Sequence, residues 1–205
     1  MSNVVVYMSM SLDGFIAAEN DGPGNGLGVG GEPLHGWLTA GNVNPETFRP
    51  ENGVNAEIFD EMLSTGAVIV GRHTFEWAGE WGGDHHEGVP IFVLTRTEPV
   101  PAVRGLAHYV SDLGSAVARA KEAAGDRDVM MHGASSVQAL LSAGLVDEVA
   151  ITLVPILLGR GKRFFDERPA ASGLRLVRSV EGAGVLHLRY EVLGSGERGQ
   201  RSRTA

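Results

Sequence analysis

Six short apolar runs, rich in β-branched residues, constrain what this chain can fold into. They lie at residues 3–11, 67–71, 90–95, 106–111, 128–133 and 146–159, the last of which runs on into a loop. Because most of these runs show no polar alternation, we expect strands that are buried on both faces. Helical patterns follow several of them, at residues 55–64, 112–125 and 134–144. This alternation predicts a three-layer α/β fold, with helices on both faces of a mostly parallel sheet.

The remaining segments differ from this pattern. Residues 174–181 and 184–193 alternate apolar and polar side chains on either side of Gly182-Ala183, which predicts a terminal antiparallel hairpin. Residues 20–53 contain Gly and Pro throughout and predict a long loop that acts as a lid or cleft wall. The polar residues 194–205 predict a disordered tail, so that one domain spans residues 1–193.

Composition excludes several classes of function. The chain has 205 residues, enough for one domain with a single core, and a net charge of −8. This charge argues against a general nucleic-acid binder, which needs a cationic face. The absence of cysteine excludes disulfides, thiolate metal sites and a cysteine nucleophile. Since neither a signal-peptide pattern nor an apolar run of about 18–20 residues occurs, we expect a cytoplasmic protein with no membrane partner.

Three polar motifs stand where predicted strands end. They are GRHTFE at 71–76, LTRT at 94–97 and HGASSV at 132–137. The glycines allow a ligand to approach the backbone, helix starts offer free N–H groups to phosphates, and arginine binds phosphate bidentately. Taken singly, each motif is explained about as well by a capping turn or a polar strand exit. Together they predict a phosphate-bearing ligand, such as a dinucleotide, at one edge of the sheet.

The three motifs also resemble those of the dihydrofolate reductase superfamily. Two further segments, SLDGFIA at 11–17 and VDEVAITLVPILLGRGKRFFD at 146–166, are similar to the bacterial branch that includes the C-terminal reductase domain of the riboflavin-biosynthesis protein RibD. The resemblance covers about residues 3–193. It implies a dihydrofolate reductase-like fold, a homodimer, and NADPH-dependent hydride transfer to a C=N or C=O group of a small pterin-like or pyrimidine-like heterocycle.

The resemblance also implies which residues contact the cofactor. The cofactor phosphates would be covered by Gly71, Arg72, His73 and Thr74. The adenosine 2′-phosphate, which favours NADPH over NADH, would lie by Thr95 and Arg96, with Arg72 as a second cation. The pyrophosphate and nicotinamide ribose would lie on Gly133, Ala134, Ser135, Ser136 and Val137. The nicotinamide would contact Ile16 and Ala17, with Ser9 on the strand beneath.

The substrate end departs from the true dihydrofolate reductases. Their pterin-binding carboxylate falls at Asn55 in this chain, and asparagine cannot supply a proton, which argues against folate reduction. Asp13 is the candidate catalytic residue, orienting substrate or a water, although an Asp-Gly pair fits a capped turn equally well. The candidate substrate contacts are Trp37, Phe59 and Leu157.

Several alternatives stay open at this point. A weak dihydrofolate or pterin reductase, and an NADPH-binding module without turnover, fit the same motifs. Arg160, Lys162 and Arg163 could bind a substrate phosphate or be solvated loop charges. The run Asp84-His85-His86-Glu87 has the composition of a metal cluster, but adjacent residues rarely converge on one ion, so we expect no metal site.

Overall fold

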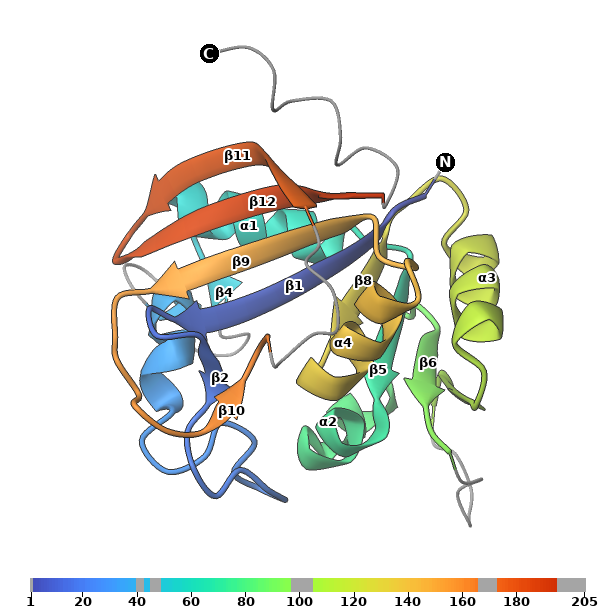
Figure 1. Cartoon of the computed structure of the whole chain (residues 1–205), viewed down its shortest axis with the longest axis horizontal. Helices are drawn as coiled ribbons and strands as arrows, with labels where there is room; N and C mark the ends of the chain where they lie inside the picture. The colour runs from blue at the N-terminus through green and yellow to red at the C-terminus, as the bar shows by residue number, and fades with distance from the viewer. Residues whose placement is uncertain (1, 40–42, 45–48, 97–104, 166–172, 195–205) are drawn as a thin grey trace.

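Eight strands form the central sheet of the computed structural model, which describes residues 2–39, 43–44, 49–96, 105–165 and 173–194. They are β1 (Val4–Ser11), β5 (Ala67–Gly71), β6 (Ile91–Leu94), β7 (Ala107–Val110), β8 (Val129–His132), β9 (Glu148–Val154), β11 (Gly173–Gly182) and β12 (Val185–Leu193). Their order is β11-β12-β9-β1-β8-β5-β6-β7 (Figure 1). Strands β9 to β7 run parallel, and β12 and β11 are antiparallel. The predicted mostly parallel sheet with an antiparallel C-terminal hairpin is confirmed.

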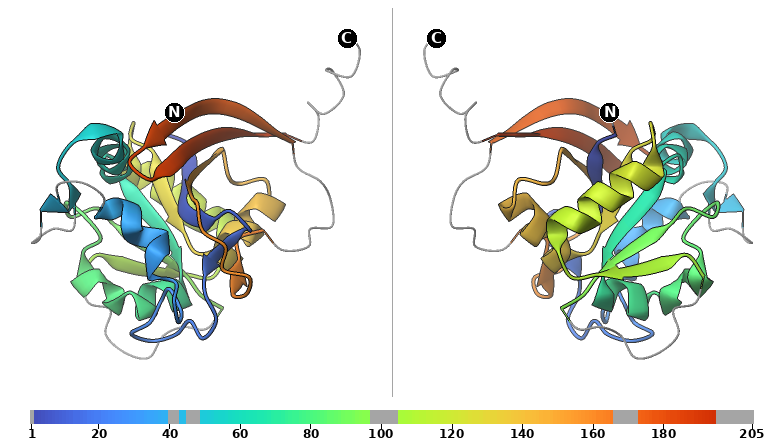
Figure 2. Two further views of the ribbon diagram at one scale, coloured as in Figure 1. Left: turned by 90° about the vertical axis from the view of Figure 1, so that its left-hand side faces the viewer. Right: turned by 90° about the vertical axis from the view of Figure 1, so that its right-hand side faces the viewer.

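Helices cover both faces of this sheet. They are α1 (Gly53–Leu63), α2 (Arg72–Trp77), α3 (Leu113–Ala124) and α4 (Ala134–Ser142). Helices α3 and α4 pack on one face, and α1 and α2 pack on the other (Figure 2). Strand β1 shows why two layers are needed, because Val4 and Val6 enter the core of the first face while Val5 and Tyr7 enter that of the second. The predicted three-layer α/β fold is therefore confirmed.

The terminal hairpin turns one residue later than predicted. β11 ends at Gly182 and β12 begins at Val185, so the turn residues are Ala183 and Gly184. Gly184 has φ +76°, a conformation in which a side chain is strained. A Cβ on Gly182 would lie 2.0 Å from the side-chain oxygen of Asn55, so this glycine is required by a close approach rather than by the turn.

The segment predicted as one long loop is structured where it is described. Residues Glu32–Leu38 form a 3-10 helix, η1, whose Leu34 and Trp37 are 0% and 4% exposed. Two short strands follow, β3 (Val43–Asn44) and β4 (Arg49–Pro50), before α1 begins at Gly53 rather than at 55. The loop prediction for 20–53 is therefore wrong for η1, because two buried side chains anchor it against the domain.

Short elements without a sequence signal complete the fold. β2 (Phe15–Ala17) pairs antiparallel with β10 (Lys162–Arg163), and a second 3-10 helix, η2 (Gly79–Gly83), follows α2. No helix among the described residues is long and apolar enough to cross a membrane. The predicted disordered tail falls outside the described residues, apart from Gly194.

The packing of η1 can be tested by a truncation. Leu34→Ala removes a side chain with no exposed surface, so we expect it to lower the free energy of unfolding by about 2–5 kcal/mol. The matched variant Leu157→Ala truncates a side chain that is 74% exposed and should change stability by less than about 0.5 kcal/mol. Urea unfolding monitored by circular dichroism measures both. Equal, small effects would mean that η1 is not packed on the domain.

Candidate functional site

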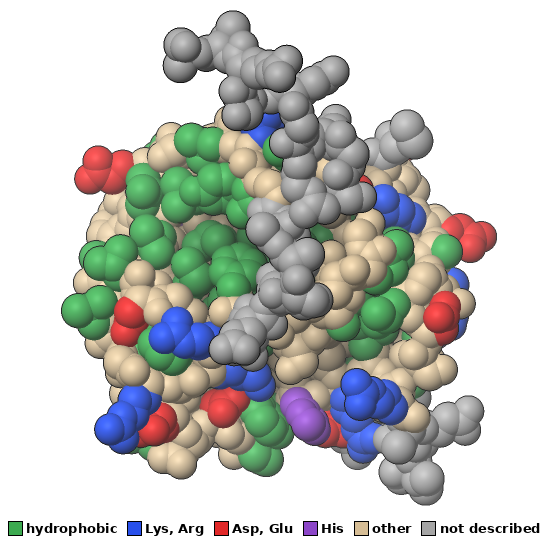
Figure 3. All heavy atoms as spheres, in the orientation of Figure 1, with side chains coloured by type: hydrophobic (Ala, Val, Ile, Leu, Met, Phe, Trp, Pro, Cys, Tyr) green, Lys and Arg blue, Asp and Glu red, His purple; other side chains and the backbone are tan. Residues whose placement is uncertain are grey.

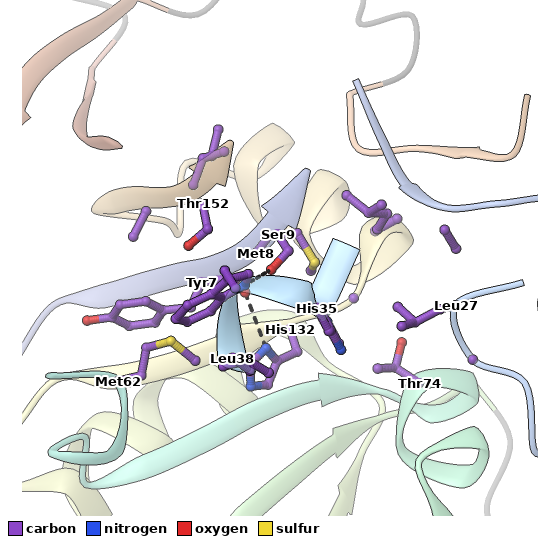
Figure 4. Close-up of a pocket in the computed structure, with 18 of the residues that line it drawn as sticks. Tyr7, Met8, Ser9, Leu27, His35, Leu38, Met62, Thr74, His132 and Thr152 are labelled. Atoms are coloured by element: carbon purple, nitrogen blue, oxygen red, sulfur yellow. Dashed lines mark hydrogen bonds between the residues drawn. The ribbon is translucent and has the colours of Figure 1, made fainter. Parts of the chain in front are cut away.

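A cavity of about 430 Å³ opens beside the carboxyl ends of the central strands (Figure 4). Sheet, helix and loop elements all contribute to its lining, and most of the side chains are apolar. The lining includes Tyr7, Met8, Ser9, Ile16, Ala17, Leu27, His35, Trp37, Leu38, Ile58, Phe59, Met62, Thr74, Trp77, Trp81, His85, His132, Gly133, Ala134, Ile151, Thr152, Lys162, Arg178 and His187. An apolar cleft with a few polar groups at this place in an α/β sheet is the usual form of a small-molecule site.

The three sequence motifs meet at this edge of the sheet. Strands β8, β5 and β6 are neighbours that end within one residue of each other, with Val70 opposite His132 and Gly71 opposite Leu94. The turns into α2 and α4 touch, since a Cβ on Gly133 would lie 2.8 Å from the hydroxyl of Thr74. Gly133 also has φ +92°, so both its conformation and its surroundings exclude a side chain.

The predicted cofactor and substrate residues divide into two groups. Those that line the pocket are Ser9, Ile16, Ala17, Trp37, Phe59, Thr74, Gly133 and Ala134. Those that do not line it are Gly71, Arg72, His73, Thr95, Arg96, Ser135, Ser136, Val137 and Leu157. Val137 is fully buried in the core beneath α4, Arg72 forms an ion pair of 2.6 Å with Glu76, and the ring of His73 stacks on Trp77.

Two residues predicted for the substrate end, Asp13 and Leu157, lie outside the lining of the pocket. Asp13 does not line the pocket, because its carboxylate accepts hydrogen bonds from the Ser11 hydroxyl (2.6 Å) and from the backbone N–H groups of Leu158 (3.1 Å) and Gly159 (2.7 Å). These hydrogen bonds, that of Ser11 first, hold the pKa of Asp13 below its usual range. Asp13 therefore joins the turn after β1 to the loop after β9. Leu157, on that loop, is 74% exposed and lies outside the pocket.

A row of polar side chains crosses three strands at the pocket and has no motif in the sequence. Ser9 on β1 is directly opposite Thr152 on β9, which is opposite His187 on β12. Residues in register on adjacent strands point to the same face, so the three side chains face the cavity together. Ser9 accepts a hydrogen bond of 2.9 Å from the indole N–H of Trp37. The alternation of apolar and polar residues over 185–193 is a sequence signal from which the side of the strand that His187 occupies could have been predicted. It gives no information that His187 lies beside Thr152.

Asn55 completes the row and determines the tautomer of His187. Its amide nitrogen donates to the carbonyls of Trp37 (2.9 Å) and Ala183 (3.3 Å), so its oxygen faces His187 Nε2 at 3.1 Å. Nε2 must therefore carry the hydrogen, and Nδ1 accepts from the Thr152 hydroxyl at 3.0 Å. Burial, followed by the charge of Arg178, lowers the pKa of His187 to about 4.

The cations of the pocket are paired with carboxylates. Arg178 donates to Glu61 at 2.7 Å, and the Glu61 carboxylate also binds Arg189 and the Tyr7 hydroxyl. Of the three basic residues after β9, Lys162 lines the pocket, 3.5 Å from Asp21. Arg163 lies over the ring of Phe15, and Arg160 borders a separate surface hollow.

The acidic and histidine run at 84–87 does not form a metal site in the described structure. No three histidine or carboxylate side chains among the described residues converge to hold an ion. The Asp84 carboxylate instead accepts from the backbone N–H of Gly88, and His85 and His86 contact each other. His132 bonds to the carbonyl of Tyr7 (Figure 4).

A mostly parallel sheet closed by an antiparallel hairpin, with a ligand-sized pocket at the carboxyl ends of its central strands, is the architecture of the dihydrofolate reductase-like class. Within that class the chain belongs to the RibD C-terminal domain family, whose profile matches residues 2–188. The uncharacterized protein YwjB of Bacillus subtilis (strain 168) is 25% identical over 187 residues, which cover 91% of this chain and 95% of YwjB.

Two solved structures share the fold. One is a protein of Shewanella sp. PV-4 that is provisionally assigned to riboflavin biosynthesis, with a TM-score of 0.68, 23% identity, and coverage of 94% of this chain and 99% of that chain. The other is a pyrimidine reductase-like protein of Corynebacterium diphtheriae, with a TM-score of 0.61, 13% identity, and coverage of 94% and 92%. At these identities the likeness establishes the architecture alone.

The contact between Asn55 and His187 predicts a measurable shift in pKa. Asn55→Asp places a carboxylate against Nε2, and an opposite charge at this distance should raise the pKa of His187 by about 1–3 units. Titration of the histidine side chains by NMR measures this, with the exposed His108 as the reference in the same spectra. An unchanged pKa of His187 would show that the two side chains are not in contact.

Proposed function

We propose that the protein is an NADPH-dependent reductase that transfers hydride to a C=N or C=O group of a small, pterin-like or pyrimidine-like heterocycle. The observation that carries the proposal is that one pocket combines the glycine-bounded start of α4 with an apolar recess that ends in a row of hydroxyl and imidazole groups. Membership of the RibD C-terminal domain family supports the reaction class.

The turn between β8 and α4 fits the phosphates of a dinucleotide. The first hydrogen bond within α4 joins Val137 N–H to Gly133 O, so the N–H groups of Ala134, Ser135 and Ser136 have no partner within the helix. No side chain caps α4, so a ligand can bind these N–H groups without displacing a cap. In the proposed complex, α4 holds the pyrophosphate, Thr95 and Arg96 hold the 2′-phosphate, and the bound nicotinamide supplies the hydride.

The opposite end of the pocket fits a planar ring with a polar edge. Trp37, Phe59 and Met62 supply apolar surface for the ring. Because Ser9 accepts from Trp37, its own hydrogen can turn toward a substrate. Because the Thr152 hydroxyl gives its hydrogen to His187, its oxygen can accept from a substrate N–H. The pair therefore suits an edge that carries both a hydrogen-bond acceptor and a donor.

A hydride reduction also needs a proton, and Asn55 cannot provide one. The pair of Thr152 and His187 can provide this proton. When His187 is protonated at Nδ1, that nitrogen donates to the Thr152 oxygen, and the threonine hydrogen is then free to point into the cavity. Transfer of the threonine hydrogen to substrate, followed by transfer from Nδ1 to threonine, returns His187 to its neutral form. Asn55 positions the ring by accepting from Nε2 throughout.

The cofactor preference is tested by titrating NADPH and NADH into the protein and following tryptophan fluorescence, since Trp37, Trp77 and Trp81 line the pocket. Arg96 is exposed at the carboxyl end of β6. One charge-assisted phosphate contact contributes about 1.5–3 kcal/mol, so Arg96→Ala should weaken NADPH binding about ten- to a hundredfold and leave NADH binding unchanged.

A matched control separates this contact from the loss of a surface charge. Arg127 is also exposed but precedes β8, at the opposite edge of the sheet, so Arg127→Ala should bind NADPH as the wild type does. Failure of both nucleotides to bind at millimolar concentration would refute the cofactor assignment. Equal losses of NADPH affinity in the two variants would refute the role of Arg96.

The homodimer expected from the resemblance is part of the same proposal. β11 is the edge strand, and its Leu174, Leu176 and Val177 are 44%, 55% and 55% exposed. Figure 3 shows hydrophobic side chains gathered on the same face of the molecule. Burial of such a face favours association. Light scattering should give twice the mass of one chain, and Leu176→Glu should give monomers; a monomeric wild type would exclude the dimer.

A further inference from the structure

Three histidines form a continuous chain between two backbone carbonyl groups at the pocket. His132 Nδ1 lies 3.3 Å from the carbonyl oxygen of Tyr7, and His132 Nε2 lies 3.2 Å from Nε2 of His85. His85 Nδ1 lies 2.7 Å from Nδ1 of His86, whose Nε2 lies 3.2 Å from the carbonyl oxygen of Thr65. His85 and His132 line the cavity, and His86 is buried behind them.

The two ends of the chain determine where hydrogens must lie. A carbonyl oxygen only accepts, so His132 Nδ1 must carry a hydrogen toward Tyr7. The Thr65 hydroxyl gives its hydrogen to the carbonyl of Met62 at 2.8 Å, so it too can only accept from His86, at 3.4 Å. His86 Nε2 must therefore carry a hydrogen toward Thr65. In their neutral forms, His132 and His86 then present bare nitrogens to His85.

The chain consequently has one hydrogen too few. Four gaps separate the two carbonyls and the three rings, but three neutral imidazoles supply only three hydrogens. The single hydrogen of a neutral His85 can fill the gap to His86 or the gap to His132, and two lone pairs face each other across the other gap. A fourth hydrogen would complete every bond and would give the chain one positive charge.

The free protein disfavours that charge. Burial, followed by the charges of His132 and His86, lowers the pKa of His85 to about 2. Burial likewise lowers the pKa of His132 to about 4, with further contributions from His35 and His86. The charged groups that lower these two pKa values are therefore other histidines: His35 on η1, His132 on β8 and His86 in the 84–87 segment.

The nearby carboxylates are engaged elsewhere. Asp21 and Glu61 pair with Lys162 and Arg178, and Asp84 accepts from Gly88 N–H. Glu87 is exposed. Among the described residues, no carboxylate forms a hydrogen bond or ion pair with His132, His85 or His86, so a bound anion would be the first negative charge in contact with the chain.

We propose that the chain of His132, His85 and His86 takes up one proton when an anionic group binds at the adjacent start of α4. His132 immediately precedes Gly133, and both residues line the same cavity, so the anion and the histidine chain share one low-dielectric site. The inference rests on the proposed function, because it takes the nucleotide phosphates as the anion. According to this proposal, the positively charged histidine chain forms only when the anion is bound.

The sign of the pH dependence follows from linkage. Binding raises the pKa of the chain above its low value in the free protein, so between the two values the complex holds one proton more than its separate components. Each unit of rising pH in that interval weakens binding up to tenfold, and above the raised pKa the affinity becomes constant. Nucleotide affinity should therefore increase on acidification from about pH 8 to about pH 6.

Isothermal titration calorimetry with NADH, which lacks the titrating 2′-phosphate, tests this. Heats measured at about pH 6 in two buffers of different ionisation enthalpy give the number of protons taken up, which we expect to approach one and to fall toward zero at about pH 8. His85→Gln should abolish the uptake and weaken binding about tenfold at the lower pH only. His108→Gln, which changes an exposed histidine outside the chain, should keep the wild-type uptake.

The outcomes separate this inference from the proposed function. If neither NADH nor NADPH binds, the proposed function fails. If they bind without proton uptake at any pH, the inference is overturned while the function stands. Uptake that persists in His85→Gln would also overturn it. Should His85→Gln not fold, ¹⁵N shifts of the wild-type protein decide, since one of His132, His85 and His86 must carry hydrogen on both ring nitrogens only in the complex.

Discussion

Burial of both faces of the central strands is the constraint on which the rest of the structure depends. β1 and β8 have no solvent-facing side, so helices must cover the sheet above and below. Parallel neighbours can be joined only by crossovers, and each crossover leaves its strand at the carboxyl end. The turns after β5 and β8 are therefore gathered at one edge, and the pocket lies beside them.

Inside that pocket, the low dielectric makes hydrogen bonding decisive, because a buried polar group without a partner is costly. Asn55 is a buried polar side chain whose amide has hydrogen-bond partners at both its nitrogen and its oxygen. Its amide bonds to two carbonyls and thereby orients its oxygen toward His187, which in turn orients Thr152. Asn55, at the position where the resemblance to dihydrofolate reductases implies a carboxylate, therefore belongs to a fully hydrogen-bonded arrangement. In the chain of His132, His85 and His86, by contrast, one of the four hydrogen bonds lacks its hydrogen. In our proposal, this missing hydrogen is the proton that the chain takes up when an anion binds.

The sequence predicted much of the fold because periodicity and glycine placement are local signals. The strands at 67–71 and 129–132 and the turns into α2 and α4 follow from apolar runs that end in glycine. The misses have a physical cause as well. η1 depends on Leu34 and Trp37 inserting into a core made by distant segments, which glycine-rich composition cannot reveal. Asp13 bonds to Leu158 and Gly159, which are far away along the chain.

The sequence by itself determined the class of fold, the edge of the sheet where the pocket lies and the absence of an acid at position 55, since each depends on residue type and local order. Only the tertiary structure decided which side chains face the pocket together. Ser9, Thr152 and His187 come from three strands, and the histidine chain joins β8 to the loop after η2. Such groupings depend on strand register and on contacts between distant segments, and a hydrogen bond between distant residues leaves no periodic trace in the sequence.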